Sequence, residues 1–430
     1  MPAFRFIHAA DLHLDSPFRG MAGLPDSIRE TVRRSTFDAL DALVDLAERE
    51  HADFILIAGD VYDAADRSLR AQLRLQKAMR RLAGSGIPAY VIHGNHDPDD
   101  GRAARLDWPD TVRFFSSREP ESMLARSQSG EVLARIYGMS YRTAAVTDNL
   151  AARYGHIPDA PYHIALLHTN VDGDPAHDNY APCTLRELLL SRMDYWALGH
   201  IHTRRVLHES PFIVYSGNTQ GRSVRETGAK GCYVVDVTAN GSTALSFRAL
   251  DAVRWFQTEV SIEDTESDQA LKDKIERDLE RIRLEAEGRP AIVRLSLTGR
   301  GPLHTKLTKA GYLEELAAEF REAETERAAY GAFVWLESVK RRTSLEADRE
   351  ALLAQSGFLG DLLRMCEELL ADEEKLEQFC GEAAAALLDN PRAAKYAGVA
   401  FGADERREWL WGAQQLAIDL LADAEGRDAP

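Results

Sequence analysis

Cysteines and long apolar runs are both scarce in this sequence. The 430 residues contain four cysteines, at Cys183, Cys232, Cys366 and Cys380. Their spacing matches neither a CxxC zinc site nor a disulfide framework, so they are interpreted as free thiols. No run of about 18 uncharged apolar residues is present, and the first residues lack the basic and apolar regions of a signal peptide. The sequence therefore predicts a cytoplasmic protein with no membrane partner.

Positive charge is also in deficit. The chain has 52 Lys and Arg against 69 Asp and Glu, a formal net charge of -17, which argues against a surface that is basic throughout and coats nucleic acid. The deficit is uneven, because residues 341–430 alone hold 10 Lys and Arg against 19 Asp and Glu. The rest of the chain is therefore free to carry local basic patches.

Seven short, apolar, β-rich segments recur through roughly the first 250 residues. They are residues 4–10, 53–59, 87–94, 162–168, 195–200, 211–217 and 231–237. Several are apolar throughout, as in strands that are covered on both faces. Helical patterns at residues 27–50 and 67–84 separate the first three segments. This βαβαβ beginning and the strand-rich half after it predict an α/β domain with layered sheets over residues 1–250.

Two smaller regions are predicted after this domain. Residues 251–340 alternate strand, helix, strand, helix and strand, with the helices expected at 268–288 and 303–324, which predicts a compact α+β domain. Residues 341–430 are predicted to be helical throughout, with an acidic face opposite an apolar one. The expected apolar face consists of Leu362, Leu363, Met365, Leu369 and Leu370.

Most of the β-rich segments are followed directly by side chains that can bind a metal ion. These side chains are Asp11 and His13, Asp60 and Asp63, Asn95 and His96, His168, and His200 and His202. Because ligands bind beyond the carboxyl ends of the strands in α/β sheets, we expect residues that are far apart in the sequence to meet in space there.

Each of these clusters also has an ordinary structural explanation. A DxH pair occurs often by chance, an HxH pair lies on one face of any strand, and the glycines before Asp60, Asn95 and His200 fit simple turns. Five clusters in one order, each offering only oxygen and nitrogen donors, favour a metal site instead. Two divalent cations about 3.5–4 Å apart need a bridging carboxylate, and this donor set suits manganese, iron or zinc.

The blocks DLH, GDVYD, GNHD, H and GHIH, in this order over residues 11–202, resemble the signature of the calcineurin-like metallophosphoesterases. The resemblance implies a layered α/β/β/α sandwich and two divalent metal ions, with Mn²⁺ favoured over Fe²⁺ or Zn²⁺. It implies that one metal is bound by Asp11, His13, Asp60 and His202. It implies that the other is bound by Asp60, Asn95, His168 and His200, so that Asp60 is the bridge.

The same resemblance implies a mechanism. His96 corresponds to a histidine that binds no metal but contacts the scissile phosphate or protonates the leaving oxygen. A hydroxide held between the metals, its pKa lowered by their charge, would attack phosphorus in line. The metals and His96 would then offset the charge that develops on the phosphoryl and leaving oxygens. Asp15 is expected beside the site as a loop residue that binds no metal.

Three longer stretches resemble one branch of this superfamily, the SbcD/YhaO-like DNA-repair exonucleases. They are HAADLHLDSPF, GDVYDAADRSLRAQ and YSGNTQGRSVRETGAKGCYVVDV. The resemblance implies a DNA substrate, a capping domain at residues 251–340 that helps shape the DNA groove, and an SMC-like coiled-coil ATPase as partner. A homodimer is left open. Residues 341–430 would be a docking element for the ATPase, with intramolecular packing as the alternative.

The chain also departs from this branch at one position. Asp63 stands near the place where archaeal and eukaryotic members tend to have a histidine that is linked to exonuclease action. The residue that makes this phosphate contact is therefore left open by the sequence, and so is the strength of any exonuclease activity.

Basic residues supply candidates for contacts to a phosphate backbone. One set recurs at helical spacing and consists of Arg67, Arg70, Arg74, Lys77 and Arg81. A second set lies in the loops after the HxH pair and consists of Arg204, Arg205, Arg222, Arg225 and Lys230. A solvated helix face is the alternative explanation for the first set.

Three functions follow from this reasoning, in order of preference. The first is a two-metal DNA exonuclease or endonuclease subunit in DNA repair. The second is a phosphatase or phosphodiesterase for a small substrate, which a closed pocket rather than a duplex-sized groove would favour. The third, a non-catalytic scaffold subunit of an ATPase complex, is disfavoured because every ligand position is filled.

Overall fold

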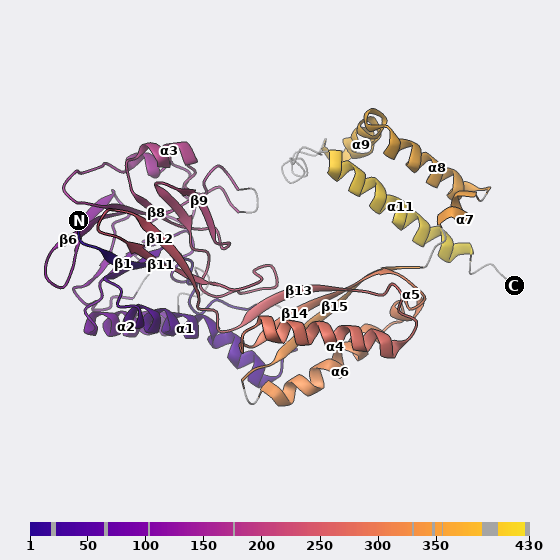
Figure 1. Ribbon diagram of the computed structural model, residues 1–430, viewed down its shortest axis with the longest axis horizontal. Coiled ribbons are helices and arrows are strands. Elements are labelled where there is room, and N and C mark those ends of the chain that lie inside the picture. Colours follow the sequence, from indigo (N-terminus) through magenta and orange to yellow (C-terminus); the bar gives the residue numbers. More distant parts are fainter. Residues whose placement is uncertain are drawn as a thin grey trace. The chain divides into compact units, whose positions relative to one another are not determined.

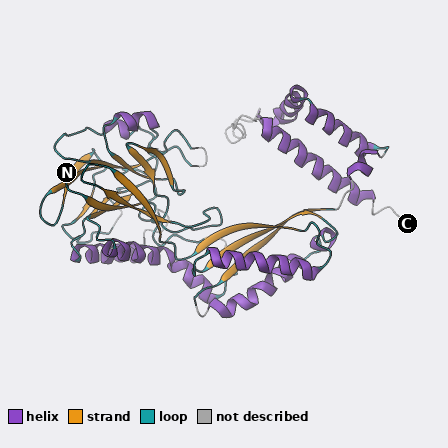
Figure 2. Cartoon of the chain, viewed as in Figure 1, coloured by secondary structure: helices purple, strands orange, loops and turns teal. Residues whose placement is uncertain are grey.

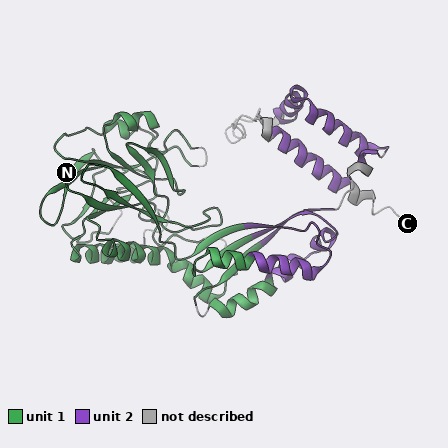
Figure 3. Cartoon of the chain, viewed as in Figure 1, with its two compact units in different colours: residues 1–257, 279–294, 318–338 green, residues 258–278, 295–317, 339–430 purple. Residues whose placement is uncertain are grey.

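The computed structural model describes residues 1–18, 23–63, 68–101, 104–174, 177–328, 331–345, 349–354, 356–388 and 403–425. Arg67, a predicted phosphate contact, lies outside these residues. The chain forms two compact units (Figure 3). The first comprises residues 1–257, 279–294 and 318–338, and the second comprises residues 258–278, 295–317 and 339–430. This division runs through the segment 251–340, so the three predicted domains stay a prediction.

Two six-stranded sheets form most of the first unit (Figure 2). One has the order β12-β11-β1-β2-β3-β4, with β12 Thr243–Ala249, β11 Gly231–Val237, β1 Phe4–Ala9, β2 Phe54–Ala58, β3 Ala89–Ile92 and β4 Val112–Phe114. The other has the order β5-β6-β7-β8-β10-β9, with β5 Glu121–Arg126, β6 Val132–Gly138, β7 His163–His168, β8 Tyr195–Gly199, β10 Phe212–Tyr215 and β9 Arg205–Glu209. All seven segments predicted as strands are strands; β4, β5, β6, β9 and β12 were not predicted.

The apolar strands are buried on both faces, as predicted. In β1, Ile7 lies in a core shared with the helices α1 (Asp26–Arg49) and α2 (Leu69–Gly84), whereas Phe6 lies in a second core between the two sheets. Successive side chains of a strand point to opposite faces, so one apolar segment supplies both cores. Each fully buried large apolar side chain stabilises the fold by roughly 1.5–3 kcal/mol.

The outer face of the second sheet carries a third core. Trp196 of β8 packs there with Tyr154, next to the short 3-10 helix Ala151–Arg153, and with Leu188 of α3 (Leu185–Leu190). The chain is therefore layered as helix, sheet, sheet and helix, as the sequence predicted. The layer that covers the second sheet consists mainly of loops and very short helices. The layer that covers the first sheet consists of the long helices α1 and α2.

A three-stranded sheet, of order β13-β14-β15, occupies the predicted α+β region. Its elements are β13 Arg254–Ser261, α4 Asp268–Glu285, β14 Ala291–Arg300, α5 His304–Leu307, α6 Tyr312–Arg327 and β15 Val334–Ser344. The single helix predicted over 303–324 is wrong, because two helices form there. Gly311 separates them with φ of +85°, a left-handed conformation that a continuous helix cannot contain.

Beyond β15, which extends to Ser344 and so makes the helical prediction wrong for residues 341–344, the described part of the C-terminal region consists of helices, as predicted (Figure 1). They are α7 Arg349–Ala354, α8 Phe358–Ala371, α9 Glu373–Leu388 and α11 Ala403–Glu425. Of the predicted apolar face, Leu363 is fully buried, but Met365 is 41% exposed, so the face is narrower than predicted.

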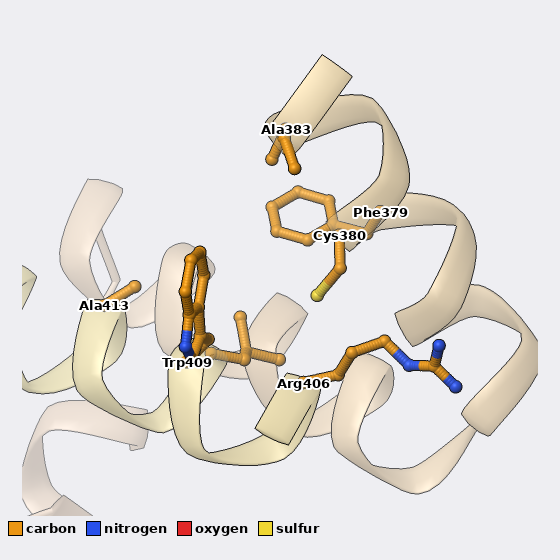
Figure 4. Close-up of a pocket in the computed structure, with 8 residues that line it drawn as sticks. Phe379, Cys380, Ala383, Arg406, Trp409 and Ala413 are labelled. Carbon is orange, nitrogen blue, oxygen red and sulfur yellow. The ribbon is translucent and has the colours of Figure 1, made fainter. Parts of the chain in front are cut away.

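Facing side chains of α9 and α11 line a small apolar pocket of about 200 Å³ (Figure 4). Phe379 and Cys380 enter it from α9, and Trp409 and Ala413 enter it from α11. All four cysteines of the chain are free thiols, as predicted. Among the described helices, none is both long enough and apolar enough to cross a membrane.

Candidate metal centre

The predicted ligands lie in loops whose backbone is strained. Asp11, His13, Asp60 and His200 all have positive φ, at 52°, 41°, 48° and 100°. Residues other than glycine seldom adopt this region, and such strain is concentrated at functional sites. Two hydrogen bonds between the loops hold this conformation, from Asp11 N to Gly59 O at 3.0 Å and from His13 N to Asp60 O at 3.0 Å.

Three glycines precede the predicted ligands because the imidazole of His168 passes directly over their backbone. A Cβ atom at Gly59 would lie 2.4 Å from His168 Nδ1, and one at Gly94 would lie 2.3 Å from Asp60 Oδ1. At Gly199 it would lie 1.9 Å from the carbonyl oxygen of Ala58. These glycines therefore permit close approach within the site, which is a stronger requirement than an ordinary turn.

One group of potential ligands consists of Asp11, His13 and His202, whose donor atoms lie within 4.8 Å of one another. The Nε2 atoms of the two histidines are 3.1 Å apart. His202 Nδ1 lies 2.7 Å from Glu226 Oε1, so it carries the proton and leaves the Nε2 lone pair facing His13. Burial holds the pKa of His13 well below its usual range. The Nε2 atoms of the two imidazoles therefore face the same space.

A second group consists of Asp11, Asp60 and His168, and Asn95 and His200 adjoin it. His168 Nδ1 donates to Ala58 O at 3.0 Å, and His200 Nε2 donates to Asp178 O at 2.8 Å. The remaining nitrogens, His168 Nε2 and His200 Nδ1, lie 2.9 and 3.1 Å from Asn95 Oδ1. Backbone carbonyls thus fix both rings so that three acceptor atoms converge.

This convergence requires a positive charge. Burial lowers the pKa of His200 to about 3, so its ring is neutral. Burial also lowers the pKa of His168, but the Asp60 carboxylate outweighs it and raises this pKa to about 9. A proton on His168 can supply the charge, and a divalent cation that replaces this proton satisfies all three acceptors. The residues present therefore fit a metal ion with oxygen and nitrogen ligands.

Asp60 lies between the two groups. Its Oδ2 atom is 3.7 Å from His13 Nε2 and 3.4 Å from His168 Nε2, while its Oδ1 accepts a hydrogen bond from His96 N at 2.8 Å. Burial raises the pKa of Asp60, but the adjacent His168 outweighs this effect and holds it well below the usual range. The Asp60 carboxylate therefore has the position and the negative charge that a ligand shared by two metals needs. The bridging role itself stays a prediction.

His96 lies at the more open side of the same space. Its side chain is 36% exposed, and its Nδ1 lies 3.3 Å from Asp63 Oδ1. Burial lowers the pKa of His96, but the hydrogen bond to Asp63 and the negative charges of Asp60 and Asp63 together outweigh it, so this pKa is raised. Asp63 also accepts from Ser16 Oγ at 2.9 Å. In this chain Asp63 therefore orients His96 through Nδ1, and one donor atom each of His96, His13 and Asp60 lie within 4.8 Å of one another.

Two residues near the site are best explained as structural. Asp97 accepts hydrogen bonds from Val61 N at 2.9 Å and from Gly94 N at 2.8 Å, and so ties the two ligand loops together. Asp15 accepts from Ser68 Oγ, the residue that caps α2. Asp15 is thus a loop residue whose carboxylate contacts the residue that caps α2.

Sequence reasoning missed Glu226 and the true place of Arg222. Glu226 accepts from His202 Nδ1, from Asn218 Nδ2 at 2.9 Å and from Arg222 N at 2.7 Å. The Arg222 guanidinium lies 3.4 Å from both Asp63 and Glu226, so this predicted DNA contact faces the residues that orient His96 and His202. The only sequence signal was the short spacing of the two residues in QGRSVRE.

His177 is another residue that the sequence did not single out. Its ring centroid lies 5.6 Å from that of His200 and 5.7 Å from that of His202. No motif surrounds it in the sequence, and only the fold of the loop after β7 reveals that it is near the site.

The basic face of α2 is largely paired within the protein. Arg74 lies 2.6 Å from Asp41, and Arg81 lies 2.6 Å from Asp45, both on α1. The guanidinium groups of Arg70 and Arg74 also lie over the ring of Phe37, 4.9 and 5.5 Å from its centroid. This arrangement differs from both expectations, a track for phosphates and a solvated face, because Arg70 and Arg74 contact side chains of α1.

The other predicted phosphate contacts follow the HxH pair. Arg205 lies 3.3 Å from Asp174. Arg204 lies over the ring of Phe247, 3.9 Å from its centroid. The structure thus brings Arg204 and Arg222 to the vicinity of the ligands, while Arg70 and Arg74 turn toward α1.

Comparison with known proteins agrees with this geometry. Residues 4–204 match the calcineurin-like phosphoesterase family, and residues 255–344 match the middle domain of metallophosphoesterase YhaO. The uncharacterized metallophosphoesterase YhaO of Bacillus subtilis is 44% identical over 346 residues, which cover 80% of this chain and 83% of that protein.

Two more distant similarities extend this picture. The DNA double-strand break repair protein Mre11 of Sulfurisphaera tokodaii is 28% identical over 212 residues, which cover 48% of this chain and 51% of that protein. A solved dimetal phosphatase from Danio rerio aligns with 58% of this chain and 97% of its own at 12% identity. Its TM-score of 0.36 is too low to support an argument. The resemblance stated from the sequence is thus confirmed: the chain belongs to the calcineurin-like metallophosphoesterases, in their SbcD/YhaO-like branch.

Proposed function

We propose that this chain is a two-metal phosphodiesterase that cleaves DNA, as an exonuclease or endonuclease subunit in DNA repair. The observation that carries the proposal is the convergence of His168 Nε2, His200 Nδ1 and Asn95 Oδ1 beside the Asp60 carboxylate. The similarity to Mre11, a DNA double-strand break repair protein, supports DNA as the substrate. The oxygen and nitrogen donors support Mn²⁺, with Fe²⁺ or Zn²⁺ as further outcomes.

The protein's own groups divide the work at this site. Asp11, His13, Asp60 and His202 would hold one metal, and Asp60, Asn95, His168 and His200 would hold the other. When bound, the metals would polarise the phosphoryl group and make a water molecule more acidic. His96, held by Asp63 through Nδ1, presents its other ring nitrogen to the leaving oxygen. Glu226 keeps His202 in the orientation in which Nε2 is free to bind.

A second candidate function is hydrolysis of a small phosphodiester or phosphomonoester. It is favoured by the pairing of Arg74 and Arg81 with α1, because acidic partners on α1 already neutralise these two arginines and compete with a DNA backbone for them. A scaffold without catalytic activity is less well supported, because every predicted ligand is present and the described ligand side chains converge.

The deciding experiment uses three substrates with Mn²⁺: linear double-stranded DNA, single-stranded DNA and an aryl phosphodiester. We expect the wild type to cleave DNA, Asp60→Ala to cleave nothing, and the exposed control Asp107→Ala to behave as the wild type. Cleavage of the aryl ester alone, even with a candidate ATPase present, would reject DNA as the substrate. Full activity in Asp60→Ala would reject the metal assignment.

We also propose that the C-terminal helices bind an SMC-like coiled-coil ATPase. The support is the exposure of large apolar side chains there, with Phe358 at 73%, Trp409 at 58% and Trp411 at 56%. Size-exclusion chromatography with the ATPase is expected to show a complex that Trp411→Ser weakens. A stable homodimer that forms without the ATPase, and that Trp411→Ser dissociates, would assign this surface to self-association instead.

A further inference from the structure

A cavity of about 320 Å³ adjoins the candidate metal centre and shares one residue with it. Its lining includes His202, Arg204, Asn218, Gly228, Lys230 and Phe247. The imidazole of His202 belongs to the metal-binding group, while its backbone carbonyl accepts a hydrogen bond from Lys230 Nζ at 3.2 Å. The cavity is therefore one residue away from the place where a scissile phosphate would be bound.

The ammonium group of Lys230 has no carboxylate partner among the described residues, although the side chain is only 8% exposed. Two carboxylates contribute to its electrostatic surroundings, Glu226 and Asp251. Glu226 is already bound by His202, and Asp251 by Arg254 at 2.8 Å. A buried charge without a counterion is unfavourable, and an anionic group in the cavity would compensate it.

Two further features of the lining suit a nucleotide. The guanidinium of Arg204 stacks on Phe247, 3.9 Å from the ring centroid, and such a flat cationic pair can stack a base. Asn218 is fully buried at the edge of the cavity: its Nδ2 donates to Gln220 O and to Glu226 Oε2, both at 2.9 Å, and its Oδ1 has no hydrogen-bond partner among the described residues.

The wall of the cavity near Arg204 is bare backbone. A Cβ atom at Gly217 would lie 2.8 Å from both His202 O and Arg204 N. At Gly228, which has a positive φ of +76°, a Cβ atom would meet nothing within 4 Å, so the cavity is open there. Glycine at position 217 therefore lets two backbone segments of the wall pack closely, whereas the space beside Gly228 is open to a ligand.

We propose that this cavity binds the nucleotide next to the scissile phosphodiester, with its phosphate at Lys230 and its base on the Arg204–Phe247 stack. The inference rests on the proposed nuclease function and refines it. Substrates that carry a second phosphate beyond the scissile one would be preferred over simple aryl phosphodiesters, which cannot fill the cavity.

Binding tests the cavity directly, without turnover. A fluorescent, 5′-phosphorylated oligothymidine is titrated into metal-free protein in the presence of a chelator, and its anisotropy is followed at several salt concentrations. We expect Arg204→Ala and Lys230→Met each to weaken binding about tenfold and to reduce the salt dependence. Lys230→Arg, which keeps the charge, should bind nearly as well as the wild type. Arg113→Ala, an exposed arginine on β4, is the control.

Kinetics with Mn²⁺ separate a substrate contact from a structural role of Lys230. A substrate contact predicts that the ratio of kcat/KM for the oligonucleotide to that for the aryl ester falls about tenfold, mainly through KM. If Lys230 only supports His202, Lys230→Met lowers kcat/KM equally for the oligonucleotide and for the aryl ester, and the inference is overturned. If circular dichroism shows that Lys230→Met does not fold, the Arg204→Ala variant tests the inference by itself, because Arg204 is exposed. If the wild type cleaves DNA and the variants bind and discriminate between substrates as it does, the cavity is rejected as a nucleotide site but the nuclease function stands. If the wild type cleaves no DNA, both proposals are rejected.

Discussion

The loops of the candidate metal centre and the basic face of α2 were both predicted as binding sites, but their polar groups have opposite surroundings. In the loops, ring nitrogens of His168 and His200 face the amide oxygen of Asn95, and either a proton on His168 or a metal ion that replaces this proton satisfies them. On α2, Arg74 and Arg81 already have acidic partners on α1. Groups that are left unsatisfied by their own fold are the ones available to a ligand, whereas groups that are paired contribute to the fold.

Adjacent residues in the loop after β3 provide the sharpest test of this difference. We expect His96→Ala to lose about 10²- to 10³-fold in turnover while it keeps its metals, because it removes a proton donor but no ligand. Asn95→Ala should instead bind less metal. The metal content of each variant is measured by mass spectrometry after dialysis, next to activity. A loss of metal in His96→Ala would make this histidine a ligand.

A smaller effect is expected from crowding the site without removing any functional group. Gly94→Ala would place a Cβ atom 2.3 Å from Asp60 Oδ1, whereas Gly84→Ala, at the end of α2, meets nothing within 4 Å. Because a displacement of about 1 Å costs about 10²-fold in rate, Gly94→Ala should lose activity to that extent. Gly84→Ala should retain it. Equal activity in the two variants would show that the ligand loop tolerates rearrangement.

Glu226→Gln tests the orientation of His202. An amide can turn its NH₂ group toward His202 Nδ1 and stabilise the wrong tautomer, so metal affinity should fall about 10- to 100-fold. The affinity is measured by titrating metal-free protein with Mn²⁺. A variant with unchanged affinity would show that Glu226 only supports the fold near Arg222. Circular dichroism serves as the control for folding.

The smallest effects are expected on α2. The exposed pair of Arg74 and Asp41 should contribute less than about 1 kcal/mol to the free energy of unfolding, which a double-mutant cycle with Arg74→Ala and Asp41→Ala in urea measures. DNA cleavage should be unchanged by Arg74→Ala. Should this variant instead weaken DNA binding with a reduced salt dependence, the basic face would be a DNA track after all.

Much of the fold was predictable because apolar segments and helical periodicity are local properties of the chain. The strands from β1 to β3 and the helices α1 and α2 were predicted within two or three residues of their observed ends. Short or half-exposed strands such as β4 and β5 were missed, because their burial pattern depends on neighbouring strands. The helix predicted over 303–324 was wrong because the conformation of Gly311 is not visible in a periodicity.

The sequence by itself determined the family, the fold class and the set of candidate ligands, because those residue types must follow strands in a particular order to bind two metals. Only the tertiary structure decided which charges are satisfied internally. It paired Arg74 with α1, placed Glu226 behind His202, and left Lys230 buried without a carboxylate partner among the described residues. These contacts join residues far apart in the chain, and spacing along a sequence carries no information about the partner that a charged side chain meets.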